Sequence, residues 1–481
     1  MGACHSGQMT TMSRSLPLNS AVTIVSDIKS GKRSCEEVVQ SLLDAIERND
    51  VGAFISLDKS RLLALARARE LDARRVAGEP LGRLHGVPIV VKDNIHVKGL
   101  PNTAGTLALI DFTPFESAPV VARLEAEGAV VLGKTNMHEL AMGVTSIHPE
   151  GSPFPSVRNA CSPQHISGGS SGGTGAALGA GQAVVGLGTD TAGSIRIPAA
   201  MNGVFGLRPT TAWASAGDSA QEPRPRYPQE GITPCSATRD TAGPMGICVE
   251  DLALLDSIIT GEPLAEPCEL KGLRLGRPRF FWTELEADVS DRAEEALLSL
   301  SRAGVEVVPV DLDVKELCGK VGFAVIFFEM KRALTEYLEK YCPSVSVEDL
   351  IGQCKEPAVQ RLFSPAAAGF FKPEEYTEAL EKHRPALQKM YAETFERHSI
   401  QGLVFPTVKE PACKHSEVAG RPMLFADISR NTDPGTNAGL PGITLPIGKT
   451  SSGLPVGLAI DGPVDTDRNL LSIALAAQVL L

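Results

Sequence analysis

A stretch rich in glycine and serine holds the side chains of this sequence that are best suited to catalysis. Residues 166–210 read ISGGSSGGTGAALGAGQAVVGLGTDTAGSIRIPAAMNGVFGLRPT, and Ser170 and Ser171 stand there between two pairs of glycines. Ser194 follows at the end of the run TDTAGS. A serine hydroxyl attacks a carbonyl carbon when a base removes its proton. The stretch therefore fits a serine nucleophile, and it fits a purely structural glycine-rich turn equally well.

The residues around these serines predict a backbone that accommodates a substrate. Glycines adopt positive φ and let a ligand approach the main chain closely. We expect residues 174–181 to form a helix of small side chains, whose N-terminus favours negative charge near the serines. A strand over 183–188 then leads into residues 189–194, where the small side chains of Ala192 and Gly193 leave N–H groups free. Such N–H groups are what an oxyanion hole requires.

A match to a phosphate-binding motif is better explained by a strand. Residues 128–135 read GAVVLGKT, which fits the expression G-x-x-x-x-G-K-T. A phosphate cradle needs a flexible turn between its glycines, whereas the intervening Ala, Val, Val and Leu favour extended structure. We therefore predict a core strand that ends at Gly133 and no nucleotide site.

The glycine-serine stretch also contains G-x-S-x-G, the pattern of the nucleophile elbow in α/β-hydrolases. An elbow follows an apolar strand and works with a histidine late in the chain, but residues 161–167 predict no such strand. The late histidines, His383, His398 and His415, stand in charged or polar surroundings. Neither the histidines nor the ten cysteines show the spacing of metal ligands. We expect no metal and no organic cofactor.

The elements that position these residues belong to a large globular chain. It has 481 residues, of which 43% are hydrophobic, and a net charge of −11 without a basic run. Nucleic acid and anionic membranes favour clustered basic charge, so we expect neither as a partner.

No uncharged apolar run reaches the roughly 18 residues of a membrane helix, and the N-terminus lacks the apolar core of a secretory signal. We expect a cytoplasmic protein with a flexible tail at 1–20.

Helical and extended patterns alternate along the chain, which predicts an α/β fold. Ser34 and Glu37 fit a capping box at a helix start, a second helix is expected at 59–77, and Lys92 ends a buried strand at 87–91. The other expected elements are a helix at 118–127, a strand at 128–132, a loop or flap at 211–235, a helix at 291–302, a strand at 305–310, helices over 315–400, strands at 403–406, 442–447 and 454–462, and a helix at 468–480. Together they predict one large mixed, mostly parallel central sheet covered by helices on both faces.

Residues 166–210 as a whole resemble the signature of the amidase signature family, G-G-S-S-G-G followed by G-T-D-x-G-G-S-x-R-x-P-A. The similarity continues in the run from His85 to Asp93, in residues 133–139 and in two C-terminal motifs at 439–442 and 453–457. It spans about residues 25–481. The resemblance implies the fold of that family in a single domain at 21–481, with a signature core at about 80–210 and a helical insert at about 315–400.

The resemblance also implies a Ser–Ser–Lys triad, in which Lys92 is the base, Ser170 is the bridging serine and Ser194 is the nucleophile. In the family a cis peptide precedes the bridging serine, which corresponds here to the bond between Gly169 and Ser170. Lysine is charged at its usual pKa near 10.4, so we expect burial to lower the pKa of Lys92 and leave it partly neutral. The other implied roles are an oxyanion hole from the N–H groups of Thr191, Ala192, Gly193 and Ser194, support from Ser171, Asp190 and Arg196, and a substrate pocket at Met142, Gly143 and Gly169.

Ala192 departs from the family pattern, which has glycine at this position. Its N–H group can still donate a hydrogen bond, so we expect the oxyanion hole to remain. The added methyl group restricts φ and narrows the pocket. This departure therefore affects the size of the substrate and leaves the chemistry intact.

Within the family, residues 136–140 (NMHEL), 238–243 (TRDTAG) and 431–434 (NTDP) are most similar to the indoleacetamide and mandelamide hydrolases. The similarity implies hydrolysis of a small aryl-acetamide-like amide to a carboxylate and ammonia or an amine. Carbamates (urethanes), anilides and esters present a similar carbonyl to the serine and are alternative substrates. A glutamyl-tRNA amidotransferase subunit and a non-catalytic binding protein are alternative functions. We expect a small-molecule amide or carbamate substrate and a monomer or homodimer.

Overall fold

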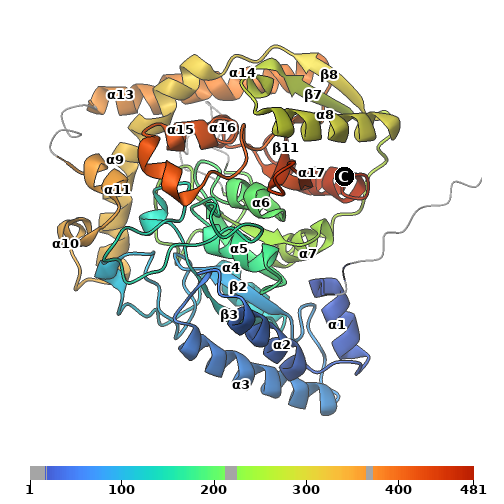
Figure 1. Ribbon diagram of the computed structural model, residues 1–481, viewed down its shortest axis with the longest axis vertical. Coiled ribbons are helices and arrows are strands. Elements are labelled where there is room, and N and C mark those ends of the chain that lie inside the picture. Colours follow the sequence, from blue (N-terminus) through green and yellow to red (C-terminus); the bar gives the residue numbers. More distant parts are fainter. Residues whose placement is uncertain (1–16, 18, 212–224, 365–371) are drawn as a thin grey trace, which may run out of the picture.

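A single eleven-stranded sheet forms the centre of the molecule, with strand order β1-β3-β2-β4-β6-β5-β10-β11-β9-β7-β8 (Figure 1). The computed structural model describes residues 17, 19–211, 225–364 and 372–481. The strands are β1 (Phe54–Ile55), β2 (Pro88–Lys92), β3 (Val130–Thr135), β4 (Val185–Asp190), β5 (Phe205–Arg208), β6 (Thr241–Gly246), β7 (Arg274–Pro278), β8 (Glu306–Val310), β9 (Gly402–Pro406), β10 (Gly442–Lys449) and β11 (Pro455–Asp461). The expected α/β architecture with a large mixed sheet is confirmed.

Strand direction differs from the expectation of a mostly parallel sheet. The pairings β2–β3, β2–β4, β7–β8 and β7–β9 are parallel. The pairings β1–β3, β4–β6, β5–β6, β5–β10, β10–β11 and β9–β11 are antiparallel and outnumber them. Only a few residues separate β10 from β11, which is enough for an antiparallel hairpin but too few for a parallel crossover. Alternating helices and strands therefore predicted the layers correctly and the strand directions incorrectly.

Helices cover both faces of the sheet. They are α1 (Ala21–Lys29), α2 (Cys35–Arg48), α3 (Leu57–Val76), η1 (Leu107–Leu109), α4 (Pro119–Ala126), η2 (Glu139–Ala141), α5 (Gly172–Gly179), α6 (Arg196–Asn202), α7 (Val249–Thr260), η3 (Arg279–Trp282), α8 (Ala287–Arg302), α9 (Lys315–Tyr341), α10 (Val347–Gln353), α11 (Pro357–Leu362), α13 (Pro373–Glu378), η4 (Ala379–His383), α14 (Arg384–His398), η5 (His415–Gly420), α15 (Leu424–Ser429), α16 (Asp433–Ala438) and α17 (Asp467–Ala477). Ser34 and Glu37 form the expected capping box of α2.

The residues of β11 show which helices cover each face of the sheet, because successive side chains of a strand point to opposite faces. A side chain at Gly457 would meet Ala200 of α6. The neighbouring Val456 and Leu458 instead belong to a buried cluster that also contains residues of α8 and α17. Helix α6 therefore covers one face of this strand, and α8 and α17 cover the other.

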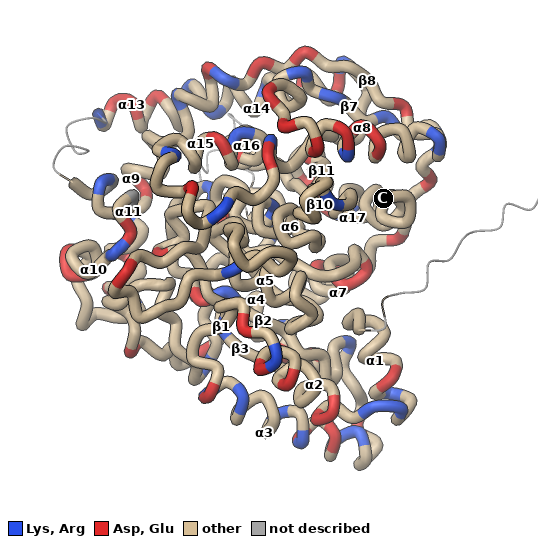
Figure 2. Tube along the Cα trace, viewed as in Figure 1, with Lys and Arg blue, Asp and Glu red and all other residues tan. Residues whose placement is uncertain are grey.

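Charged residues of both signs lie mainly on peripheral helices such as α2, α3, α8 and α13, whereas α5 carries none (Figure 2). Small side chains fill this central region, and a side chain at Gly173 or Gly179 would collide with neighbouring backbone atoms. None of the described helices combines the length and apolar character needed to cross a membrane.

Most expected elements are present, with shifted ends. Strand β3 runs two residues beyond the predicted end at Gly133, and the two-residue strand β1 was not predicted. The predicted flap at 211–235 lies partly outside the described residues, as does most of the predicted tail at 1–20. The described part of 315–400 is mostly helical, as expected.

The serine-bearing segments lie where two parallel strands end. Strands β2 and β4 pair in parallel, with Val91 opposite Leu187. Lys92 is the last residue of β2, and Asp190 is the last residue of β4. Because the carboxyl ends of parallel neighbours lie at the same edge of a sheet, Lys92 is brought beside the segment that leads to Ser194.

Candidate active site

Lys92 lies between two hydroxyl groups in the interior of the protein. Its Nζ donates to Ser170 Oγ and to Thr189 Oγ1, each at 2.7 Å, and lies 3.4 Å from the Thr189 carbonyl oxygen. All three residues are buried. Asn94 Nδ2 also donates to Thr189 Oγ1, at 3.1 Å. The structure thus brings Lys92 to Ser170, as the resemblance implied, and adds Thr189 as a second partner.

The protonation of Lys92 follows from its burial. Removal from water lowers the pKa of Lys92 to about 7, although the negative charges of Asp190 and Asp240 act in the opposite direction. Burial penalises the charged form of an amine, so a neutral fraction is present near neutral pH. A neutral amine that contacts a hydroxyl can take its proton, which is what a general base requires.

The two glycine-rich segments that carry the serines are joined through their backbones. The Ser171 N–H donates to the Ser194 carbonyl oxygen at 3.1 Å, and the Ser171 hydroxyl donates to the Thr189 carbonyl oxygen at 3.2 Å. The peptide between Gly169 and Ser170 is cis, as expected. Ser171 therefore ties the Ser170 segment to the Ser194 segment, in line with the supporting role predicted for it.

The carbonyl oxygen of Ser170 is held by a neighbouring loop. The His138 N–H donates to it at 3.1 Å, and the Ser146 hydroxyl lies at 3.5 Å. His138 Nδ1 accepts from the Ser146 N–H at 3.1 Å, so the side chain of His138 also fixes Ser146. Sequence reasoning did not assign a role to His138 or Ser146, because no local pattern indicates that residues 138–146 contact Ser170.

A buried charge cluster fixes the loop between β4 and α6. Asp190 accepts from Arg196 Nε at 3.2 Å and from Arg208 at 3.2 Å, and all three side chains are fully buried. Burial alone would raise the pKa of Asp190, but the two guanidinium groups outweigh it and hold the pKa below its ordinary value. Asp190 is thus ionised, and its predicted link to Arg196 is present. Arg208, which was not predicted, is the second cation.

Asp190 also orders the main chain around Ser194. Its carboxylate accepts from the Gly193 N–H at 2.8 Å and from the Ile195 N–H at 3.2 Å. The N–H of Gly193 is therefore engaged, which differs from its predicted role in the oxyanion hole. The N–H groups of Thr191, Ala192 and Ser194 donate to none of the described residues.

The same three residues line a small cavity, which we call the catalytic cavity, while Gly193 does not line it. Buried N–H groups normally have an acceptor, so a group of free ones beside a cavity marks a place for an external oxygen. The side chain of Thr191 is fixed by a bond of 2.6 Å to Asp240 Oδ1, and the carbonyl of Ala192 accepts from Thr432 Oγ1 at 2.7 Å. The loop between β4 and α6 is therefore held by these two hydrogen bonds, one at Thr191 and one at Ala192.

The remaining walls of the catalytic cavity are mostly apolar side chains. They are Ala141, Met142, Val144, Cys235, Ile326 and Phe425. Met142 is thus placed as predicted, whereas Gly143 and Gly169 are not among the lining residues. Gly143 faces the ring of His138, and Gly169 packs against the backbone of residues 143–145. Ile326 and Phe425 come from distant helices, and no motif in the sequence pointed to them.

The apparent phosphate-binding run has a structural role in the fold. Lys134 of the apparent phosphate-binding run is buried in β3, where it pairs with Asp93 at 3.2 Å and donates to Asn102. Asp93 follows Lys92 directly, so this pair anchors the end of β2. The described residues contain no group of three or more His, Cys, Asp or Glu side chains that would hold a metal ion.

Comparisons with known proteins point to one family. A family model described as Amidase matches residues 37–471. Mandelamide hydrolase of Pseudomonas putida is 40% identical over 462 residues, which cover 92% of this chain and 88% of that protein. Indoleacetamide hydrolase of Agrobacterium vitis is 35% identical over 474 residues, which cover 96% and 97%. The solved structure of native peptide amidase from Stenotrophomonas maltophilia superposes with a TM-score of 0.76 at 28% identity and covers 96% of each chain.

Proposed function

The chain belongs to the amidase family, and we propose that it hydrolyses a small aryl-acetamide-like amide through an acyl-enzyme on Ser194. It is a hydrolase that acts on carbon–nitrogen bonds of amides. The observation that carries the proposed mechanism is the contact of 2.7 Å between the buried amine of Lys92 and the hydroxyl of Ser170. No other described side chain in contact with Ser170 Oγ is able to act as a base.

The proposed reaction starts with proton transfer. Neutral Lys92 takes the proton of Ser170, and Ser170 takes the proton of Ser194. The Ser194 oxygen bonds to the carbonyl carbon, and the N–H groups of Thr191, Ala192 and Ser194 stabilise the negative oxygen. Removing one such donor from a serine hydrolase costs about 2.7–4 kcal/mol of transition-state stabilisation.

The tetrahedral intermediate then loses its amine. The carbon–nitrogen bond breaks as the proton held by Lys92 returns through Ser170 to the leaving nitrogen, which releases ammonia from a primary amide. Water attacks the resulting ester while Lys92 again takes a proton through Ser170. As the ester bond breaks, Lys92 returns its proton through Ser170 to the Ser194 oxygen. The carboxylic acid that is released loses its own proton to solvent, so atoms and protons balance without a cofactor.

Two observations support an aryl-acetamide-like substrate. The names of the two relatives given above describe hydrolysis of mandelamide and of indoleacetamide, which are primary amides with an aromatic group near the carbonyl. The catalytic cavity offers apolar contacts from Met142, Val144 and Ile326 to such a group. Anilides, carbamates and esters also present a carbonyl that the same serine can attack, so they are included among the substrates tested.

The test measures release of ammonia or amine from a panel of phenylacetamide, indoleacetamide, mandelamide, an anilide, a carbamate and glutamine. We expect turnover of the primary aryl amides, and a covalent acyl adduct at Ser194 by mass spectrometry after rapid quenching. Ser194→Ala removes both, whereas the exposed Ser416→Ala changes neither. Turnover of aryl amides by the Ser194→Ala protein at the wild-type rate would contradict the role of Ser194.

We further propose that residues 21–481 act as one domain in a cytoplasmic monomer or homodimer. Support comes from the single sheet that joins strands from both halves of the chain. The described cysteines are free thiols and most are buried, which suits a reducing compartment. Light scattering of the purified protein tests the oligomeric state.

A further inference from the structure

The catalytic cavity is too small for the substrate that the proposed function requires. Its volume is about 10 Å³. That is room for about one water molecule, whereas a cavity of roughly 150 Å³ is needed to hold a benzene ring. A wall of this cavity must therefore move before an aryl amide can reach Ser194.

The wall formed by the β4–α6 loop is not the part that moves. Thr191 is bonded to Asp240, Ala192 to Thr432, and the chain between them and α6 is held by Asp190. Displacing this loop would break buried charge-assisted bonds and would scatter the N–H groups that the reaction needs. Two other side chains of the cavity wall, Ile326 of α9 and Phe425 of α15, are apolar and have no polar anchor.

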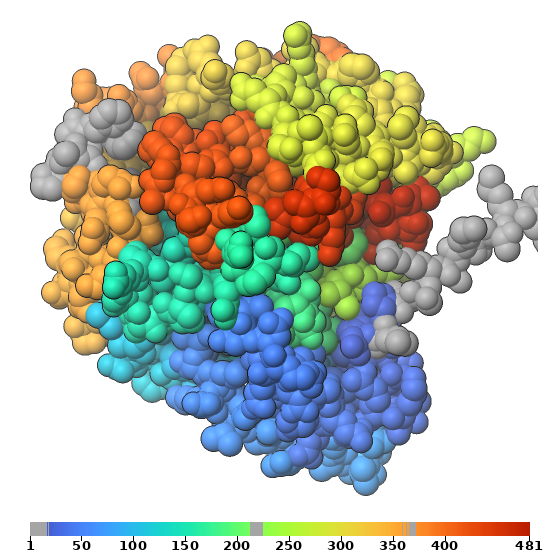
Figure 3. All heavy atoms as spheres, in the orientation of Figure 1, coloured from blue at the N-terminus to red at the C-terminus, as the bar shows by residue number. Residues whose placement is uncertain are grey.

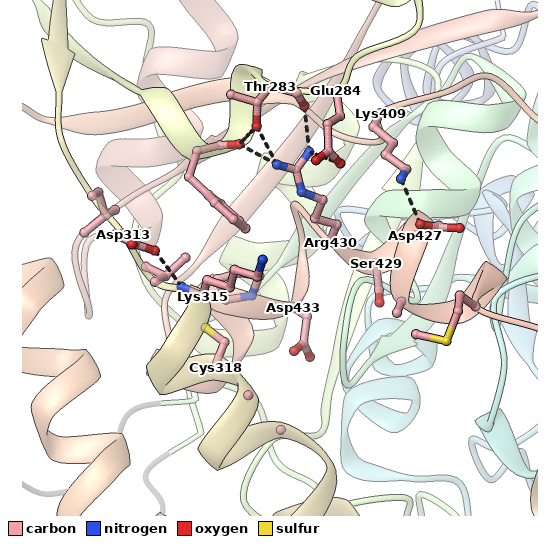
Figure 4. Close-up of a pocket in the computed structure, with 18 of the residues that line it drawn as sticks. Thr283, Glu284, Asp313, Lys315, Cys318, Lys409, Asp427, Ser429, Arg430 and Asp433 are labelled. Carbon is pink, nitrogen blue, oxygen red and sulfur yellow. Dashed lines mark hydrogen bonds and ion pairs between the residues drawn. The ribbon is translucent and has the colours of Figure 1, made fainter.

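Phe425 also lines a second and much larger space. This outer hollow has a volume of about 860 Å³ and lies between α9, α15, α16 and the η3 region (Figure 4). Three other hollows, beside Arg158, beside Lys331 and beside Tyr341, share no lining residue with the catalytic cavity. Phe425 thus lines both the catalytic cavity and the outer hollow.

Helix α9 contributes to both spaces. Gly322 and Phe323 line the outer hollow, and Ile326, one turn later, lines the catalytic cavity. The ring of Phe323 is 52% exposed and its centre lies 6.0 Å from that of Phe425. Phe323 and Phe425 therefore form an aromatic pair in the wall of the outer hollow.

The backbone beneath Phe425 is anchored, so its side chain is the movable part. Asp427 of α15 accepts from Lys409 at 2.8 Å and also contacts Arg421. Figure 4 also shows Arg430, which follows α15, bonded to Thr283. These contacts fix α15 and the segment after it, and rotation of a partly exposed phenyl ring is fast compared with helix displacement.

Several charged residues around the outer hollow pair with neighbouring groups, while Arg279, Asp311 and Lys315 also line it. Lys409 and Asp427 pair with each other at one side (Figure 4), and Arg430 donates to Thr283 and Phe280. Asp433 accepts from Arg239. The passage itself is formed by Phe323, Ile326 and Phe425. Uncharged aryl groups therefore fit this route better than anions or cations.

We propose that Phe425 is a gate and a specificity-determining residue: substrates enter from the outer hollow, and the uncharged aryl part of the acyl group displaces the Phe425 ring and packs against it. The proposal rests on the proposed function, because it assumes that Ser194 is the residue the substrate must reach.

In Figure 3 the segments near residues 150–170 (teal) and 410–440 (orange-red) lie side by side on one face, and the bridge between His165 and Lys414 joins them. The loop that leads into α15 is thereby held to the body of the protein.

The gate is tested by the rate at which sulfonyl fluorides label Ser194. In this reaction the Ser194 oxygen bonds to sulfur and fluoride leaves, so labelling does not depend on which amide is the natural substrate. Methanesulfonyl fluoride serves as the small probe and biphenylsulfonyl fluoride as the bulky one. The proteins are wild type, Phe425→Ala, Phe425→Leu, Phe425→Trp and the control Phe115→Ala, whose ring is 92% exposed and lies in no wall of either space.

We expect Phe425→Ala and Phe425→Leu to raise the ratio of bulky to small labelling rates by about tenfold or more, the scale of discrimination that apolar pockets achieve. Phe425→Trp lowers this ratio, and Phe115→Ala leaves it unchanged. Labelling of Ser194 with the same ratio in all proteins would overturn the gate and leave the proposed function standing. Absence of labelling at Ser194 in wild type would overturn the proposed function and the gate with it. Thermal unfolding confirms that each variant is folded.

Discussion

Thr189 Oγ1 and Lys92 Nζ lie 2.7 Å apart, the same separation that joins Lys92 to Ser170. Because Asn94 also donates to Thr189 Oγ1, this hydroxyl accepts two hydrogen bonds. Thr189 therefore acts as a fixed acceptor that holds the amine of Lys92 within 2.7 Å of Ser170 Oγ. Thr189 is in this sense a positioning residue.

Replacing Thr189 by valine keeps the shape of the side chain and removes the acceptor. A hydrogen bond to a charged group contributes about 1.5–3 kcal/mol, so we expect kcat/KM to fall about 10- to 150-fold. Loss of an acceptor for the charged amine also moves the pKa of Lys92 lower, so the pH–rate profile shifts to lower pH. The matched variant Thr189→Ser retains the hydroxyl and most of the activity. A fall in rate without any shift of the profile would indicate a merely structural role.

The dependence of the rate on pH follows from the protonation of Lys92. The base must be neutral, and its pKa is about 7, so kcat/KM rises tenfold per pH unit below 7 and levels off above about 8. Steady-state kinetics of an uncharged amide between pH 5 and 9 measure this. A rate that is flat between pH 5 and 7 contradicts Lys92 as the base.

The same pKa has an independent consequence for stability. Between pH 7 and 10.5 the amine is protonated in the unfolded chain and neutral in the folded protein, so the unfolded state binds more protons and the wild type gains stability as pH rises. Relative to Lys92→Met, the free energy of unfolding of the wild type should rise by up to about 1.4 kcal/mol per pH unit in that window. Urea unfolding of both proteins at pH 7.5 and 9.5 provides the comparison.

Ser170 and Ser194 could be singled out from the sequence because they lie in one long motif with a specific order of residues, whereas Lys92 stands in a separate, shorter pattern. The structure brings Lys92 and Ser170 together, as the resemblance to the family implied. Thr189 lies inside the same motif but received no role, because its function depends on β4 lying next to β2 in the sheet. The residues of a single strand do not specify which strand lies next to it in the sheet.

Two residues that line the catalytic cavity could not be predicted from the sequence, for a related reason. Phe425 and Ile326 approach Ser194 from helices far along the chain, and neither stands in a recognisable pattern. The engagement of the Gly193 N–H by Asp190 was also missed. Spacing alone shows that several N–H groups are available near Ser194, whereas their individual directions depend on the folded loop.

Asp190→Asn tests the buried charge cluster. The change leaves two fully buried guanidinium groups, those of Arg196 and Arg208, without their main counter-charge. Breaking a buried ion pair costs about 3–5 kcal/mol, which we expect as the loss in the free energy of unfolding. The control Asp427→Asn disrupts a partly exposed pair with Lys409 and should cost about 0–1 kcal/mol. Equal losses in the two variants would contradict a stabilising role specific to Asp190.

Position 193 requires glycine for two reasons. Its φ is +123°, and a Cβ atom would lie 2.2 Å from Thr432 Oγ1. Gly193→Ala therefore pushes the loop away from Thr432 and displaces Ser194. A displacement of about 1 Å can cost 100-fold in rate, so we expect kcat/KM to fall by about that factor or more.

The control for this change is Gly181→Ala. Gly181 also has positive φ, at +69°, but its Cβ would meet no atom within 4 Å. This variant therefore bears only the conformational cost of a left-handed alanine, about 1–2 kcal/mol of stability, and should keep its kcat/KM. Kinetics and thermal unfolding of both variants separate the two effects. If Gly181→Ala loses as much activity as Gly193→Ala, then backbone conformation alone explains the result and the contact with Thr432 does not control the position of Ser194.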